Sequence, residues 1–120
     1  MKILLTEYEP EILEFFNEYL SDNGYDVIAV DDGQKALDAI EKNSQIDALV
    51  TDANLPLIKG PAIAVAFHKK FPQAPICVIS GHLDAENLFQ TEAKDIKVTI
   101  KEKPFTVTEI KEWLISNGIK

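Results

Sequence analysis

Apolar β-type runs alternate with segments of helical period along the whole chain, and this alternation restricts the fold more than any other feature. The first four runs are largely continuous, as in strands that are covered on both faces. The runs are residues 2–6, 25–30, 46–51, 75–80 and 97–101. Short connections between strictly alternating strands and helices require right-handed crossovers, so the pattern predicts an α/β fold with a five-stranded parallel sheet and helices on both faces.

Proline, glycine and apolar spacing predict where the helices lie. Pro10 suits a first helical turn and Gly24 a C-terminal stop, which indicates a helix over 10–24. Its inward side chains are expected to be Ile12, Phe15, Phe16 and Leu20. Further helices are expected over 32–43 with Ala36, Leu37 and Ile40 inward, from Gly60 to "KKFP", over 83–93, and after "KPFT" with Val107, Ile110 and Leu114 inward as far as Gly118.

Length and charge restrict the classes of function. With 120 residues and 46% hydrophobic content, the chain is expected to form one domain over 1–120. A net charge of −8 opposes binding to nucleic acid or to an anionic membrane, and the apolar runs are too short to cross a bilayer. The acidic N-terminal stretch is unlike a signal peptide, so a cytoplasmic location is expected. The single cysteine, Cys77, is predicted to be a small buried apolar residue.

Polar side chains follow the ends of several predicted strands. They are Glu7 and Tyr8, then Asp52, then Ser80, then Lys103. In doubly wound parallel sheets, chemistry collects at the carboxyl ends of the strands. Carboxylates, a hydroxyl and an ammonium at one edge match aspartyl-phosphate chemistry, in which a carboxylate attacks phosphorus while a divalent cation and hydrogen-bond donors hold the phosphoryl oxygens.

Four short motifs occur in the order and at nearly the spacing of one known family. They are "ILLTEYEPE", "LVTDANLPLIKG" with Pro56 and Gly60 four and eight residues after Asp52, "VISGH" and "EKPF". On these motifs the chain resembles the receiver domains of two-component response regulators over essentially its full length. The resemblance implies a (βα)5 doubly wound sheet of flavodoxin-like strand order 2-1-3-4-5.

The resemblance also implies a role for each motif residue. Asp52 would accept the phosphoryl group, and Mg²⁺ would be held by Glu7, Asp52 and the backbone carbonyl of Asn54. The phosphoryl group would be bound by Ser80 and Lys103, and Ile100 stands at the switch position. The water that hydrolyses the product would be flanked by Asn54 and His82. A histidine kinase or phosphotransfer protein would be the donor. Because no effector segment follows, output is expected through a downstream protein. The chain would catalyse only its own phosphotransfer and dephosphorylation.

Two positions depart from the family pattern. Tyr8 stands where a second carboxylate usually ligates the metal directly, so Mg²⁺ binding is expected to be weak, although Glu7 has the reach to compensate. Ile100 replaces the switch aromatic. These departures motivate an alternative, a pseudo-receiver that acts as an interaction module without phosphorylation. Tyr8 could also be an aromatic lid packed across the rim.

Simpler interpretations of the site residues remain open. Asp52 could be a helix cap or turn residue, Ser80 a strand end, and Lys103 a solvated lysine. Pro104 favours a functional Lys103, since a cis Lys103–Pro104 bond, which is predicted here, would aim that side chain inward. A flavin site is disfavoured by the acidic "TEYEPE" stretch, and a haloacid-type hydrolase by Asn54, where a second Asp is required.

Overall fold

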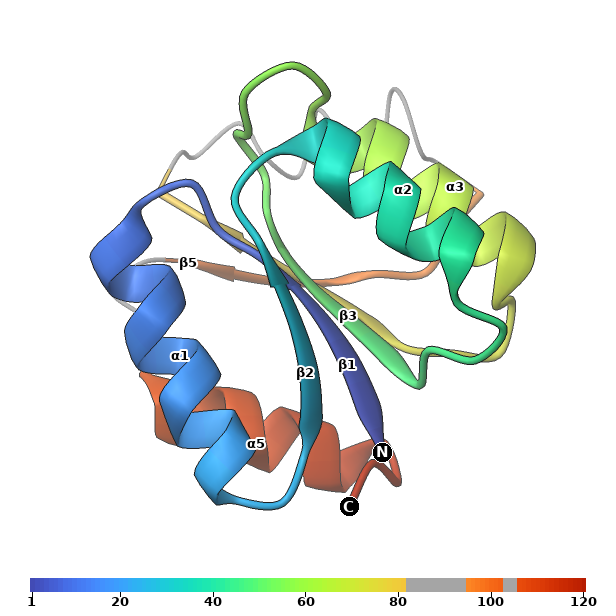
Figure 1. Ribbon diagram of the computed structural model, residues 1–120. Helices are drawn as coiled ribbons and strands as arrows, with labels where there is room; N and C mark the ends of the chain where they lie inside the picture. The colour runs from blue at the N-terminus through green and yellow to red at the C-terminus, as the bar shows by residue number, and fades with distance from the viewer. Residues whose placement is uncertain (82–94, 103–105) are drawn as a thin grey trace.

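Five parallel strands form one sheet in the order β2-β1-β3-β4-β5 (Figure 1). The computed structural model describes residues 1–81, 95–102 and 106–120. The strands are β1 (Lys2–Thr6), β2 (Asp26–Val30), β3 (Ala48–Asp52), β4 (Ile76–Ser80) and β5 (Thr99–Glu102). The parallel pairing of all neighbours confirms the predicted fold class and strand order.

Helices cover both faces of this sheet. Those in the described residues are α1 (Pro10–Asp22), α2 (Gly33–Lys42), α3 (Gly60–Lys70) and α5 (Val107–Ser116). Figure 1 shows α2 and α3 on one face and α1 and α5 on the other. The helix expected over 83–93 lies outside the described residues.

Each face of the sheet has its own apolar core. The core under α2 and α3 includes the fully buried Leu4, Leu49, Ile63, Phe67 and Val78. The core under α1 and α5 includes Ile3, Leu5, Leu20, Ile110 and Leu114. Neighbouring residues of one strand therefore enter opposite cores, which explains why the strand sequences are apolar without alternation.

Cys77 lies fully buried in the core under α1 and α5. Burial raises the pKa of its thiol to about 12, against a weaker lowering by Lys101. The thiol is therefore neutral at physiological pH, and the prediction of a buried apolar residue is confirmed.

Local signals set the helix ends. Pro10 opens α1, and Gly24 follows its end with a φ of 91°, a conformation that glycine adopts without strain. Asp32 caps α2, because its carboxylate accepts a hydrogen bond from the Lys35 amide at 2.8 Å. Pro10 and Gly24 therefore mark the two ends of α1, as predicted from the sequence.

Phe15 does not face the core, contrary to the prediction. Its side chain is 58% exposed, whereas Phe16 is 8% exposed and Leu20 is fully buried. Successive residues of an α-helix are rotated by about 100°, so a stripe that contains Phe16 and Leu20 leaves Phe15 beyond its edge. The pair of adjacent phenylalanines could not both lie on one inward face.

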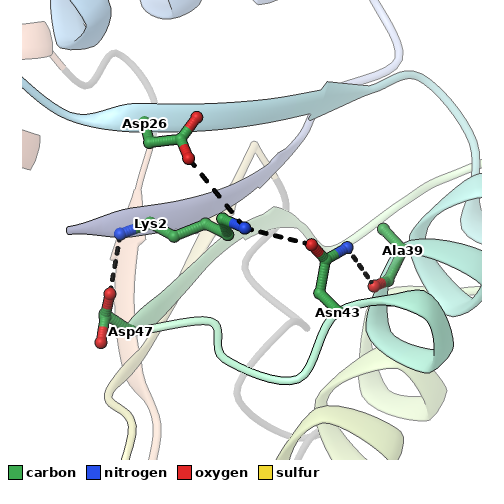
Figure 2. A network of polar contacts seen from close by, with 5 residues as sticks. All are labelled: Lys2, Asp26, Ala39, Asn43 and Asp47. Atoms are coloured by element: carbon green, nitrogen blue, oxygen red, sulfur yellow. Dashed lines mark hydrogen bonds and ion pairs between the residues drawn. The ribbon is translucent and has the colours of Figure 1, made fainter.

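A polar network joins the amino ends of β1 and β2 to the connection between α2 and β3 (Figure 2). The Lys2 amide donates to Asp47 Oδ2 at 2.7 Å, and Lys2 Nζ donates to Asn43 Oδ1 at 3.2 Å. Asn43 Nδ2 donates in turn to the Ala39 carbonyl at 2.8 Å, and Asp26 lies 4.0 Å from Lys2 Nζ. These contacts hold β1 at the end of the sheet opposite to the predicted site.

Candidate functional site at the carboxyl edge of the sheet

Buried polar side chains gather at one edge of the sheet. Among the described residues, the buried polar or charged side chains are Thr6, Glu7, Thr51, Asp52 and Ser80. All lie at or just beyond the carboxyl ends of β1, β3 and β4, which are neighbours in the sheet. Burial of polar groups is costly unless they are satisfied, so their concentration at this carboxyl edge marks it as the candidate site.

Asp52 is the last residue of β3, and only 8% of it is exposed. Its Oδ1 accepts a long hydrogen bond of 3.4 Å from the amide of Asn54, which is a local turn contact. The N-cap of α3 is Lys59, so Asp52 is not a helix cap. The structure thus removes the capping interpretation and leaves a buried carboxylate at the strand end.

Glu7 and Tyr8 follow β1 and differ sharply in exposure. Glu7 is 3% exposed and its Oε2 accepts a hydrogen bond of 3.2 Å from the Glu9 amide. The Glu7 amide donates to the Val30 carbonyl at 3.1 Å, which continues the pairing of β1 with β2. Tyr8 is 58% exposed, so it is not a lid packed across the rim. Of these two side chains, only Glu7 is buried at the carboxyl edge of the sheet.

Ser80 ends β4 and is 1% exposed, with Glu102 of β5 as its register partner. Ile100 is half-buried, pairs with Val78 and packs against the core under α2 and α3. Lys103 and His82 lie outside the described residues, as does the bond from Lys103 to Pro104. The structure therefore brings together Glu7, Asp52 and Ser80 of the predicted set.

Negative charge extends along the rim of the site. The connection from β2 to α2 carries Asp31, whose pKa is lowered by the hydrogen bond from Lys35 Nζ at 2.7 Å. Asp32 lies 3.9 Å from the same ammonium. Lys35 offsets one of these two negative charges, and the remaining charge favours the approach of cations over that of free anions.

The connection from β3 to α3 is held against the start of α2. The Pro56 carbonyl accepts hydrogen bonds from the Gly33 amide at 3.2 Å and from the Ile58 amide at 2.8 Å. A Cβ on Gly33 would lie 2.2 Å from the Ile58 carbonyl oxygen, so glycine is required there. Leu57, which lies between Pro56 and Ile58, has a φ of 72° and is 80% exposed. Leu57 therefore has an unfavourable backbone conformation without the compensation that burial of its side chain would provide.

Three residues of this edge were missed by reasoning from the sequence. Thr6 and Thr51 are buried hydroxyl residues, and Gly33 provides the close approach of α2. A signal for the threonines existed, because the parallel stretches "LLTE" and "LVTD" both place a threonine between an apolar run and an acidic residue. Gly33 had no comparable signal, since its need for glycine depends on a contact with Ile58.

A hollow of about 300 Å³ lies at the opposite, amino edge of the sheet and includes Met1, Asp47 and Ile119 among its lining residues. Its carboxylate, Asp47, already accepts hydrogen bonds from the Lys2 amide and the Gln45 side chain. The rest of the lining is apolar or carries neutral amides, so the carboxyl edge remains the candidate site.

Two features are absent from the described part of the chain. Within residues 1–81, 95–102 and 106–120, no cluster of three or more histidine, cysteine, aspartate or glutamate side chains forms a metal-binding group. Over the same residues, no helix combines the length and apolar character that crossing a membrane requires.

Comparison with known proteins assigns the family. The model of the response regulator receiver domain matches residues 3–115, and the chain belongs to this family of two-component signalling domains. A solved response regulator receiver protein from Sinorhizobium medicae is 30% identical and superimposes with a TM-score of 0.85 over 98% of this chain and 93% of that one. The chemotaxis regulator CheY4 of Vibrio cholerae, 24% identical, shares the fold with a TM-score of 0.81 over 97% of each chain.

Relatives identified by sequence are longer than this chain. A response regulator receiver protein of Anaeromyxobacter is 28% identical over 91% of this chain and 45% of its own length. The transcriptional regulatory protein PrrA of Mycobacterium tuberculosis is 26% identical over 91% of this chain and 46% of its own length. The chain therefore spans about half the length of these relatives. Receiver domains as a family interact with histidine kinases or phosphotransfer proteins and generally bind Mg²⁺ at an acidic pocket.

Proposed function

We propose that residues 1–120 form one receiver domain that accepts a phosphoryl group on Asp52 from a phosphohistidine of a histidine kinase or phosphotransfer protein, in the cytoplasm. The observation that carries this proposal is the burial of Glu7, Asp52 and Ser80 at the ends of three neighbouring strands. A nucleophilic carboxylate beside a second carboxylate and a hydroxyl is the arrangement that aspartyl-phosphate formation requires.

In the proposed reaction, a carboxylate oxygen of Asp52 attacks phosphorus in line with the phosphorus–nitrogen bond of the donor. That bond breaks, its electron pair leaves with the imidazole nitrogen, and the nitrogen takes up a proton. Ser80 would donate a hydrogen bond to a phosphoryl oxygen, and Lys103 would supply a positive charge to the product. The product is an acyl phosphate on Asp52 and a neutral imidazole on the donor.

The side chains of the carboxyl edge suit Mg²⁺, which binds through one or two carboxylates and retains several waters. Glu7 and Asp52, with the backbone carbonyl of Asn54, would hold the ion. Bound there, Mg²⁺ would neutralise charge on the phosphoryl oxygens. Tyr8 provides a neutral phenol where a carboxylate is usual and is 58% exposed, so we expect an affinity about 10- to 100-fold weaker than with a second carboxylate.

Phosphorylation would shift a two-state equilibrium and so alter contacts with a downstream protein. Ile100 stands at the switch position and packs against the core under α2 and α3. A movement of the Ser80 side chain would therefore be transmitted to that core by the aliphatic side chain of Ile100. Asn54 and His82 would flank the water that hydrolyses the acyl phosphate and thereby set the lifetime of the signal.

The direct test is incubation of the protein with a small phosphodonor and Mg²⁺, followed by intact mass measurement. We expect a mass gain of one phosphoryl group that disappears in Asp52→Ala and persists in Asp47→Asn, a matched change at the opposite edge. A wild-type chain that stays unmodified at saturating donor and Mg²⁺ contradicts the proposal.

The exposure of Tyr8 and the aliphatic Ile100 favour a second candidate, a pseudo-receiver that binds partners without phosphorylation. The change Tyr8→Asp separates the two. If only Tyr8→Asp binds Mg²⁺ tightly and becomes phosphorylated, the native site has lost this chemistry and the pseudo-receiver is correct. If the wild type is phosphorylated, the substitution should raise Mg²⁺ affinity about 10-fold or more and the first proposal holds.

A further inference from the structure

Two buried threonines lie side by side just below the candidate site. Thr6 of β1 and Thr51 of β3 are register partners and are 2% and 0% exposed. Each follows, by two residues, a fully buried leucine that belongs to the core under α2 and α3, namely Leu4 and Leu49. Because side chains two residues apart share a face of the sheet, the threonines continue this apolar surface with hydroxyl groups. Valine would fill the same space without a polar atom.

The two hydroxyls form a hydrogen-bond chain that ends on the backbone of Asp52. Thr6 Oγ1 donates to Thr51 Oγ1, and Thr51 Oγ1 donates to the carbonyl oxygen of Asp52 at 3.0 Å. A hydroxyl has one proton to donate, so this chain runs in one direction, from Thr6 to Asp52. Thr51 is therefore the residue that contacts the backbone of Asp52, and Thr6 in turn donates its hydrogen bond to Thr51.

The peptide between Asp52 and Ala53 is held at its other end too. The Ala53 amide donates to the Ile79 carbonyl of β4 at 3.0 Å. On a third side, α3 begins so close that a Cβ on Gly60 would lie 2.9 Å from the Asp52 carbonyl oxygen. The plane of this peptide is thus fixed by Thr51, by β4 and by the start of α3, directly beside the buried carboxylate.

Folding stability alone does not account for this hydroxyl pair. The net value of a buried hydrogen bond is small, and replacing both partners by apolar groups of the same shape is nearly neutral, whereas removing one partner is costly. Val at both positions would match the apolar residues around them and would leave only the Asp52 carbonyl without its hydroxyl donor. The chain that ends on the Asp52 carbonyl is better explained by what it does to Asp52.

We propose that Thr51 is a positioning residue for Asp52, whose hydroxyl holds the Asp52–Ala53 peptide so that the carboxylate meets the incoming phosphorus in line. The consequence for rate rests on the proposed phosphorylation of Asp52. Misplacement of a reacting group by about 1 Å is able to cost about 100-fold in rate. Loss of one hydrogen bond to the backbone should displace the carboxylate less, so an effect of about 10-fold is expected for Thr51→Val.

The variants Thr51→Val and Thr6→Val form a matched pair. Both remove one hydroxyl from the same buried contact, but only Thr51→Val removes the donor to the Asp52 carbonyl. We expect Thr51→Val to lower the maximum phosphorylation rate with a small phosphodonor, measured at saturating Mg²⁺, about 10-fold. Thr6→Val should stay within about 2-fold of wild type, and Thr51→Ser, which keeps the hydroxyl, should recover the rate.

The double variant Thr6→Val with Thr51→Val separates an effect on the position of the Asp52 carboxylate from an effect on folding stability. It should be more stable than Thr51→Val alone, because no buried hydroxyl is left without its partner, yet phosphorylate as slowly as Thr51→Val. If its rate recovers together with its stability, or if both single variants slow the reaction equally, the threonines are only structural and the proposal is wrong.

A second measurement needs no phosphodonor. Amide exchange at Ala53, normalised to the other amides of β3, should accelerate in Thr51→Val and remain unchanged in Thr6→Val. If the wild type cannot be phosphorylated, the proposed function fails while this comparison still decides whether Thr51 holds the peptide. Equal Ala53 exchange in the two variants overturns the positioning role.

Discussion

Asp47 has a carboxylate that the folded chain stabilises in its charged form. Its partial burial favours the neutral form, but the Lys2 amide, the Gln45 side chain and the positive charges of the N-terminus and Lys2 outweigh it and lower the pKa below 3.8. A carboxyl with a lowered pKa in the folded state contributes stability above its unfolded pKa and loses it as pH falls through the folded value. Asp47→Asn should therefore cost about 1 kcal/mol at pH 7, and the difference should shrink as pH falls below 3.8.

Urea denaturation at neutral and acid pH measures this effect. Asp26→Asn is the matched control, because Asp26 is 73% exposed and lies 4.0 Å from Lys2 Nζ, so its loss should be near zero at either pH. A cost for Asp47→Asn that is as large in acid as at neutral pH would show that charge is not the cause.

Leu57 is strained by its backbone conformation. Its φ of 72° is unfavourable for a leucine, and 80% exposure leaves it without compensating burial. Asparagine adopts the left-handed region more readily, so Leu57→Asn should stabilise the fold by about 0.5–1 kcal/mol, whereas Leu57→Val, which is β-branched, should destabilise it. Denaturant midpoints of the three proteins check the order, and a midpoint for Leu57→Asn below that of the wild type would contradict it.

At the scale of elements, Gly33 sets how closely α2 approaches the connection from β3 to α3. In Gly33→Ala the new Cβ would meet backbone atoms of Ile58 at 2.2 and 2.8 Å, and backbone cannot rotate away as a side chain does. The change should cost about 2–3 kcal/mol and shift the backbone resonances of residues 56–58.

Gly24→Ala is the control for this prediction. Gly24 has a φ of 91° but no atom within 4 Å of an added Cβ, so its substitution should cost about 1 kcal/mol and leave residues 56–58 unchanged. Equal costs for the two substitutions would mean that contact with Ile58 is unimportant.

The elements themselves were largely predictable. Continuous apolar runs such as residues 2–6 follow from burial on both faces, and Pro10 and Gly24 mark helix ends through their own backbone geometry. Phe15 was predicted wrongly because helix-period spacing identifies a stripe but not its exact edge. The left-handed Leu57 was not predictable, since its conformation depends on how Pro56 and Ile58 are held against α2.

At the scale of the whole molecule, the charge of −8 and the acidic carboxyl edge should make stability depend on divalent cations. A ligand that binds only the folded state stabilises it by about 2.7 kcal/mol when its free concentration is about 100 times the Kd. We therefore expect Mg²⁺ to raise the thermal midpoint in a saturable manner. NaCl at equal ionic strength should act without saturation, and Asp52→Ala should abolish the saturable part; a saturable shift that survives this substitution places the cation elsewhere.

The positions of the candidate site residues were predictable to the extent that strand ends determine them. Glu7, Asp52 and Ser80 each follow an apolar run, and parallel strands bring such ends to one edge. The resemblance of the surrounding motifs to receiver domains supplied the roles expected of these residues. The hydrogen bonds through Thr6 and Thr51 could not be predicted, because they require the register of β1 against β3, which the sequence pattern does not specify.

The chain ends lie near each other at the amino edge of the sheet (Figure 1), where the Tyr25 hydroxyl donates to the Ile119 carbonyl at 2.8 Å and the Asp26 amide donates to the Met1 carbonyl at 3.0 Å. A protein tethered to a biosensor chip through either tail would therefore offer its acidic rim outward, unobstructed by the support. Candidate signalling partners could be screened in that orientation without an added spacer.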